Sequence, residues 1–273
     1  MPGKIVPDKV FALFLLNPAW SRRSKQPKHQ PMKTYTKAPV WGSPELIFLS
    51  RLGTASCICP GASLAVISSM LRIENLSKNY GDYPVFKGLT HTFQPGCAAL
   101  CEEDSTGKST LLNIIAGLLE PDAGEVWIDG HSLMKAPQQA RARMVYVPDN
   151  CMLFPSQTGR ELLEQIAAEK NTHVDDKALD LACRLGLEPH LDKRFEQMST
   201  GTRRKVFLTA AALGDPAVII ADGPSNGLDT QARAALAEQF QIWSQDRVVL
   251  FASYDAELLE ACGAEIINIA ELV

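Results

Sequence analysis

The stretch LCEEDSTGKSTLL, residues 100–112, governs the interpretation of the whole chain. The apolar residues CAAL lead into it and the apolar pattern STLLNIIAGLL follows, which predicts a strand, a loop, Gly-Lys-Ser-Thr and a helix. This order is typical of a phosphate-binding loop. Backbone N–H groups near Gly107 to Thr110 would lack intrahelical partners, and the helix dipole favours negative charge at the same point. Lys108 can reach outer phosphates, and Ser109 can offer its hydroxyl to a magnesium ion.

The loop departs from the usual pattern in its first half. The pattern places a glycine five residues before the Gly-Lys pair, where this chain has Glu102. Glu103 and Asp104 follow, so three carboxylates occupy a loop that would hold an anion. Gly-Lys-Ser-Thr also occurs by chance in many chains, and the alternative is an ordinary turn that caps a helix. The remainder of the chain has to decide between the two.

Composition and charge limit the possible functions. The 273 residues suggest one or two domains, and 46% hydrophobic residues can form a sizeable core. Residues 1–69 hold nine Lys and Arg against two Asp and Glu, whereas residues 70–273 hold 18 against 29. The acidic body disfavours non-specific binding of nucleic acid. A run of about 20 apolar residues is missing from the sequence, so we expect no membrane span. Seven scattered cysteines indicate reduced, buried thiols in a cytosolic protein.

Residues 1–69 differ from the rest in composition. They are basic, rich in proline and serine, and lack sustained periodicity, as in SRRSKQPKHQPMK. One interpretation is a targeting or membrane-surface tail. The other is a disordered leader, or upstream sequence included by a misassigned start, because Met70 opens a self-sufficient domain. We expect little order there.

From Met70 onward, apolar strands alternate with helical patterns. LRIENLS, LTHTF, CAALC, GEVWI and RMVYV read as strands before a helix-rich region at about residues 159–191. We expect a turn at residues 78–83. TRRKVFLTAAAL and ARAALAEQFQIW read as helices around the strand that ends at Asp222, and RVVLFAS and EIINIA read as the last strands. Such alternation predicts a mostly parallel sheet covered on both faces, with ligands beyond the carboxyl ends of its strands. The phosphate loop and Asp222 both lie there.

With these residues in view, residues 70–273 resemble the ATP-binding subunit of ATP-binding-cassette (ABC) transporters. The resemblance rests on an ordered set of motifs: Tyr80, STGKST at 105–110, YVPD at 146–149, MSTGTRRK at 198–205 and VIIADGPSNGLD at 218–229. It implies an α/β fold of the P-loop NTPase (RecA-like) type, with a mostly parallel sheet and a small antiparallel β subdomain. It also implies a helical subdomain at about residues 150–200.

The resemblance implies a role for each matching residue. Tyr80 would stack on adenine. Ser109 and Asp222 would hold magnesium, Asp222 through water. Asp229 would contact a partner subunit across the dimer seam. The phosphates of the ATP held by this subunit would be bound by Ser105, Thr106, Gly107, Lys108, Ser109 and Thr110. The γ-phosphate of a nucleotide held by the partner subunit would be faced by Ser199, Thr200 and Gly201.

Partners and location follow from the same resemblance. ATP and Mg²⁺ are the implied cofactors. A second ATP-binding subunit, in a homo- or heterodimer, and a membrane permease are the implied partners. The helical region at 150–200 would contact the permease, with Asp149 at the hinge between two lobes. The implied location is the cytoplasm, peripheral on the inner face of the cell membrane.

Several positions depart from the family's catalytic pattern. Gly223 stands where the family has its catalytic glutamate, and Tyr254 stands where it has a histidine after the penultimate strand. Asp149 replaces the hinge glutamine. A general base contributes about 10²–10⁴-fold to a reaction rate, and Gly223 has no side chain to supply one. Tyr254 does not readily carry the positive charge that histidine can. The sequence therefore predicts that Mg-ATP binding is kept and that hydrolysis is weakened.

Three functions remain open. The first is an ABC transporter ATP-binding subunit, possibly of exporter type, that drives a separate permease. The second is a regulatory or structural partner that binds nucleotide, or only its dimer mate, and does not hydrolyse it. The third is a nucleic-acid-associated ATPase of the same superfamily, which the acidic single cassette disfavours.

Overall fold

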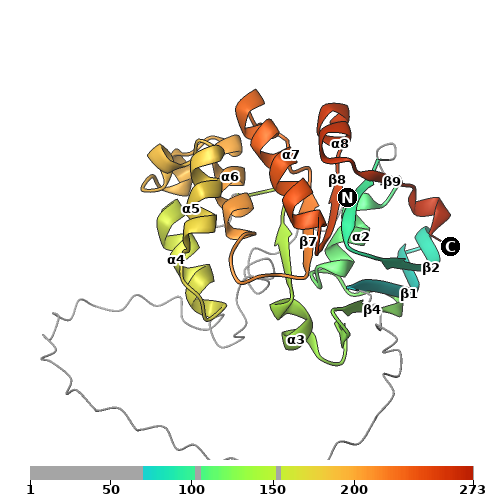
Figure 1. Cartoon of the computed structure of the whole chain (residues 1–273). Helices are drawn as coiled ribbons and strands as arrows, with labels where there is room; N and C mark the ends of the chain where they lie inside the picture. The colour runs from blue at the N-terminus through green and yellow to red at the C-terminus, as the bar shows by residue number, and fades with distance from the viewer. Residues whose placement is uncertain (1–69, 102–105, 152–154, 273) are drawn as a thin grey trace, which may run out of the picture. The chain divides into compact units, whose positions relative to one another are not determined.

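The computed structural model describes residues 70–101, 106–151 and 155–272, which form two sheets with helices around them (Figure 1). The first sheet has four antiparallel strands in the order β2-β1-β4-β5, and the second has five parallel strands in the order β6-β7-β8-β3-β9. The expected parallel sheet and its smaller antiparallel companion are both confirmed. Residues 1–69, whose order we could only expect, lie outside the described residues.

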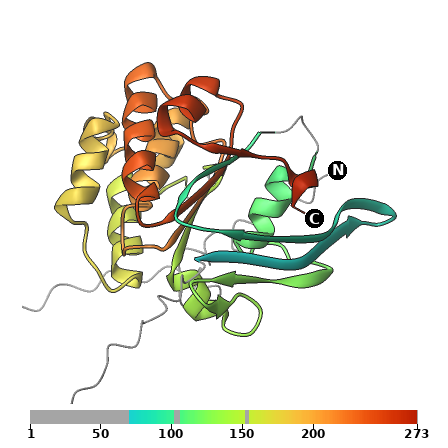
Figure 2. The ribbon, with the colours of Figure 1, turned by 45° about the vertical axis from the view of Figure 1, so that its right-hand side comes forward.

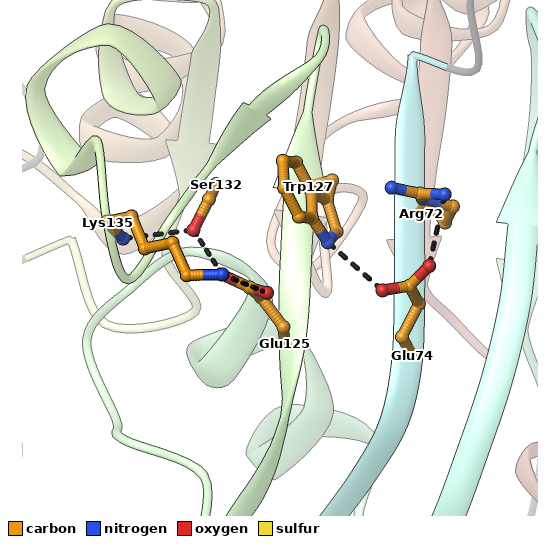
Figure 3. Close-up of polar contacts among 6 residues, drawn as sticks. All are labelled: Arg72, Glu74, Glu125, Trp127, Ser132 and Lys135. Atoms are coloured by element: carbon orange, nitrogen blue, oxygen red, sulfur yellow. Dashed lines mark hydrogen bonds and ion pairs between the residues drawn. The ribbon is translucent and has the colours of Figure 1, made fainter.

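The antiparallel sheet contributes a long hairpin. Its strands are β1 (Leu71–Tyr80), β2 (Tyr83–Phe93), β4 (Ala123–Ile128) and β5 (His131–Ser132). Leu71, Ile73 and Leu76 of β1 are fully buried, whereas the opposite face carries polar and aromatic contacts. Trp127 of β4 donates a hydrogen bond to the Glu74 carboxylate at 3.2 Å, and the Arg72 guanidinium lies 5.1 Å from the centroid of the Trp127 ring (Figure 3). These cross-strand contacts hold β1 and β4 in register.

The hairpin turn is shorter than expected. The sequence suggested a turn across residues 78–83, but β1 continues to Tyr80 and β2 begins at Tyr83. Only Gly81 and Asp82 lie between the strands, and Gly81 has a φ of +60° that suits a tight turn. Tyr80 and Tyr83 are therefore directly paired residues at the tip of the hairpin.

The parallel sheet is buried on both faces. Its strands are β6 (Met144–Val147), β7 (Val218–Asp222), β8 (Val248–Ala252), β3 (Gly96–Leu100) and β9 (Glu265–Ile267). Alternate residues of β7 enter two different clusters. Ile219 and Ala221 pack with residues of the later helices, whereas Val218 and Ile220 pack with helix α2 (Lys108–Ile115) and the antiparallel sheet. This double burial explains why the strands read as continuous apolar runs.

Most of the described helices begin at a side-chain cap. Their bounds are α2 (Lys108–Ile115), α3 (Pro137–Ala142), α4 (Gly159–Glu169), α5 (Asp176–Arg184), α6 (Thr200–Ala210), α7 (Thr230–Ser244) and α8 (Ala256–Cys262). In Figure 1, α4, α5 and α6 lie together at one end of the parallel sheet, and α7 and α8 lie side by side. The side chains of Thr158, Asp175, Ser199, Asp229 and Asp255 each cap a helix. Helix α2 begins instead at Gly107, which has no side chain to act as a cap.

Some elements were not predicted. Helix α3 and the two-residue strand β5 were missed, and the last expected strand ends at Ile267 before a short 3-10 turn. Cys97, Cys151 and Cys262 are buried thiols as expected, but Cys183 is exposed. Within the described ranges, every helix is too short or too polar to cross a membrane.

Candidate nucleotide site

A cavity of about 720 Å³ opens at the carboxyl ends of the parallel strands. Figure 1 shows α2 beside the parallel sheet, where it contacts β7 and β8, and Figure 2 shows the β1–β2 hairpin projecting on the side of α2. The lining residues come from these elements and the loops that follow β6, β7 and β8: Tyr80, Tyr83, Val85, Gly107, Lys108, Ser109, Thr110, Asp149, Asp222, Gly223, Asn226, Ala252, Ser253, Tyr254 and Asp255. Most of the predicted site residues therefore meet at one place.

The N-terminus of α2 forms the floor of the cavity. Gly107 has a φ of +97°, and a Cβ there would lie 2.5 Å from Cγ1 of Val85. Only glycine fits this position without displacing β2. Gly107 to Thr110 line the cavity, so the positive end of the helix dipole lies at it. The first N–H groups of the helix have no side-chain cap and are available to a ligand there. The alternative of an ordinary capped turn is disfavoured, and the arrangement suits an anionic ligand.

Lys108 is buried and is held by Tyr254. The Lys108 ammonium donates a hydrogen bond to the Tyr254 hydroxyl at 2.5 Å and lies 4.6 Å from the centroid of that ring. The Tyr254 side chain is 57% exposed, so it covers Lys108 from the solvent side. The backbone around it is fixed, since Ser253 accepts from the Asp255 N–H at 3.1 Å and Asp255 caps α8. A phosphate that reaches Lys108 must share its ammonium with Tyr254 or displace the ring.

Ser109 and Asp222 form a pair of oxygen donors. The Ser109 hydroxyl lies close enough to the Asp222 carboxylate to lower its pKa by hydrogen bonding. Burial raises the pKa of Asp222 above its ordinary value and the nearby Asp149 charge adds to this, whereas the Ser109 hydrogen bond, Arg204 and Lys108 act in the opposite direction. Lys108 is thus close enough to Asp222 to influence its ionisation. A hydroxyl and a carboxylate are the hard ligands that magnesium prefers.

Asp149 is engaged by neighbours that the sequence did not indicate. The guanidinium of Arg204, on α6, is 1% exposed and lies 3.0 Å from the Asp149 carboxylate. Arg204 also donates to the carbonyl of Asp149 at 2.5 Å and to the carbonyl of Gly223. The Asn226 amide donates to the same Asp149 carboxylate at 3.3 Å. Asp149 is therefore tied to α6 and to the loop after β7.

Gly223 occupies the position where the family pattern has a glutamate. Its φ is +57°, in the left-handed region, and a Cβ there would lie 2.3 Å from the Asn226 amide nitrogen. A larger residue would meet both a strained backbone and the Asn226 side chain. The position therefore lacks a base and has no room for one without a local shift.

Four of the predicted residues lie at the starts of α6 and α7, away from the cavity lining. Ser199, Thr200 and Gly201 start α6, and a Cβ on Gly201 would lie 2.0 Å from the Gly227 carbonyl oxygen. Asp229 accepts from Lys205 at 2.7 Å and caps α7. Their predicted contacts with a partner subunit stay predictions. Thr106 also lies outside the cavity lining and borders a neighbouring hollow beside Val85. Ser105 lies outside the described residues.

Comparison with known proteins identifies the family. The family model described as ABC transporter matches residues 87–226, so the chain belongs to the ABC transporter family of ATP-binding cassettes. The chain is 30% identical over 198 residues to the Nod factor export ATP-binding protein I of Paraburkholderia xenovorans (strain LB400), covering 70% of this chain and 64% of that protein. It is 31% identical over 204 residues to ATP-binding cassette sub-family A member 7 of Rattus norvegicus, covering 72% of this chain and 9% of that protein. It therefore spans less than two thirds of either relative.

Solved structures agree with the fold. The structure of the ATP-binding subunit of an ABC transporter matches with a TM-score of 0.65 and 26% identity, covering 73% of this chain and 86% of that one. A dimeric ATP-binding cassette in a post-hydrolysis state, bound to ADP and phosphate, matches with a TM-score of 0.64 and 22% identity, covering 73% and 94%. The expected P-loop NTPase fold is thereby confirmed.

Proposed function

We propose that this chain is a transport-type ATP-binding subunit that holds Mg-ATP and hydrolyses it weakly. The observation that carries the proposal is the convergence of the bare N-terminus of α2, Lys108, and the Ser109–Asp222 pair on one cavity. A cavity of about 720 Å³ is within the range of small-molecule sites. Ser109 directly and Asp222 through water would hold Mg²⁺, which would supply positive charge to the phosphates.

Weak hydrolysis follows from three features of the site. Gly223 supplies no base, and Asn226 fills the space beside it. Asp149, which could position water, is engaged by Arg204 and Asn226. Tyr254, which stands at the position of the family's histidine, accepts a hydrogen bond from Lys108. We assign Asp149 and Tyr254 a reduced catalytic role, and we assign Tyr80 and residues 105–110 to nucleotide binding.

The proposed partners are a second ATP-binding subunit and a membrane permease. Support for pairing comes from the dimeric cassette that shares the fold. In such a pair, Ser199 and Gly201 would face the partner's nucleotide and the region 150–200 would contact the permease at the inner face of the membrane. The export function in the name of the Paraburkholderia relative supports an exporter.

Steady-state release of phosphate tests the weakened site. The purified wild type, Gly223→Glu and the double variant Gly223→Glu/Asn226→Ala are compared at saturating Mg-ATP, with Lys108→Ala as the background. We expect the wild type to lie near the background and the double variant to exceed it, because Asn226→Ala makes room for the restored base. The single variant is expected to gain less. A wild-type rate as high as that of the double variant would contradict the weakened site.

A second candidate is a regulatory or structural partner that turns nothing over. It is favoured by the contacts that Lys108 and Asp149 make with Tyr254, Arg204 and Asn226, since these satisfy charged groups without a ligand. Nucleotide titration combined with sedimentation separates the two candidates. Dimerisation without measurable affinity for ATP would favour the second.

A further inference from the structure

We propose that Tyr83, together with Tyr80, forms the base-binding end of the cavity and grips a purine base by stacking. This inference rests on the proposed binding of a nucleoside triphosphate and adds a second residue to that site. Tyr83 matched no motif in the sequence and was read there as part of a turn. The structure instead places it on β2, in the lining of the cavity.

The hairpin brings the two tyrosines to one face. Tyr80 and Tyr83 are directly opposite each other across β1 and β2. Directly paired residues of antiparallel strands point to the same side of the sheet, with Cβ atoms about 4.5–5.5 Å apart. Both side chains line the cavity, and they remain 47% and 66% exposed. Neither ring is covered by the other, so both have surface for a ligand.

Val85 sets the distance from this pair to the phosphate end. Val85 follows Tyr83 by two residues on β2, so both side chains lie on one face, about 6.5–7 Å apart along the strand. Val85 in turn abuts Gly107, because a Cβ on that glycine would lie 2.5 Å from its Cγ1. Tyr83 therefore lies about 6.5–7 Å farther along β2 than Val85, which contacts the start of α2. A nucleotide whose phosphates meet Lys108 would place its base on the hairpin side of Val85.

Tyr80 alone offers limited stacking surface. The Lys78 ammonium lies 5.9 Å from the centroid of the Tyr80 ring and is fixed by Asp122 at 2.8 Å. One face of that ring thus has a cation beside it. Tyr83 is the more exposed of the two and supplies the additional aromatic surface. Stacking on aromatic side chains does not depend on the identity of the base, because every base has a π-face.

The experiment compares ligands with and without a base. Affinities of Mg-ATP, Mg-GTP and inorganic tripolyphosphate are measured for the wild type, Tyr83→Ala, Tyr83→Phe and Tyr83→Leu. We expect Tyr83→Ala and Tyr83→Leu to weaken ATP and GTP alike by about 5- to 100-fold and to leave tripolyphosphate unchanged. Tyr83→Phe should keep near wild-type affinity. Thr92→Ala, an exposed site on β2 away from the cavity, is the matched control, and urea unfolding confirms that each variant folds.

The outcomes separate the two proposals. A wild type that binds neither ATP nor tripolyphosphate overturns the proposed function, and this inference falls with it. A wild type that binds ATP, with Tyr83→Ala binding equally well, overturns the role of Tyr83 alone. Equal weakening of tripolyphosphate and ATP in Tyr83→Ala also overturns it, since the residue would then act on the phosphates or on the fold. GTP binding tenfold weaker than ATP would contradict recognition by stacking alone.

Discussion

At the scale of single residues, the site differs from the family's catalytic pattern by rearrangement as well as by replacement of side chains. Gly223 lacks a carboxylate, but its backbone also lies in the left-handed region, with Asn226 against it. Arg204 donates to the Gly223 carbonyl and to Asp149, so a buried cation joins the two positions that depart most from the family pattern. Because these contacts link the two positions, the proposed function expects a single substitution at Gly223 to raise phosphate release less than the double variant does.

We predict that Gly223→Ala lowers the free energy of unfolding by about 1–2 kcal/mol, with a further cost from contact with Asn226. The physical reasons are the φ of +57° and the 2.3 Å approach to the Asn226 amide. Urea denaturation measures the loss. In the Asn226→Ala background the loss should be smaller, because only the backbone cost remains. A neutral Gly223→Ala in the wild-type background would contradict the geometry.

At the scale of secondary-structure elements, the start of α2 differs from the capped starts of most described helices. Among the described helices, five begin at a side-chain cap, whereas α2, with Gly107 as its N-cap, and α3, with Ala136, do not. The sequence predicted this contrast at α2 because Gly-Lys-Ser-Thr follows an apolar strand. The two-residue hairpin turn was not predicted, because Gly81 and Asp82 lie within a longer polar stretch whose strand pairing is set by the β1–β2 register.

Helix α4 carries a carboxyl group that should make stability depend on pH. Burial raises the pKa of Glu169 to about 7, although a hydrogen bond from Gln165 acts in the opposite direction and lowers it. One carboxylate oxygen is buried without a hydrogen-bond partner. The folded state therefore holds a proton between about pH 4.5 and 7 that the unfolded chain releases. The contribution of Glu169 to stability is full below pH 4.5 and is lost as the pH rises through 7.

We predict that Glu169→Gln stabilises the protein relative to the wild type at pH 8 and has little effect at pH 4.5. The effect of Glu169→Gln on the free energy of unfolding should differ by about 1–3 kcal/mol between pH 8 and pH 4.5, after allowance for partial exposure of the side chain. Denaturant unfolding at both pH values measures it. The exposed Glu164 on the same helix gives the control, Glu164→Gln, which should show no such change. A difference independent of pH would show that Glu169 is solvated when folded.

At the scale of the whole molecule, the sequence predicted the architecture better than the contacts within the site. Continuous apolar strands such as Val218–Asp222 can only be buried on both faces, so the parallel sheet could be predicted. The order of motifs predicted that Lys108, Ser109 and Asp222 would meet. The contacts of Asp149 could not be predicted, because Arg204 and Asn226 reach it through tertiary packing across long sequence separations. Tyr83 was missed for the same reason, since its role depends on the hairpin register.

The account as a whole depends on a triphosphate being held at the start of α2. The most direct test is a calorimetric titration of Mg-ATP into the wild type, Lys108→Ala and Tyr254→Phe. We predict saturable binding by the wild type and an affinity about 10- to 100-fold weaker in Lys108→Ala, because a charge-assisted hydrogen bond to phosphate is lost. Tyr254→Phe should bind at least as well as the wild type, since phenylalanine has no hydroxyl to accept a hydrogen bond from the Lys108 ammonium. Equal affinities in the wild type and Lys108→Ala, or no binding by the wild type, would contradict the account.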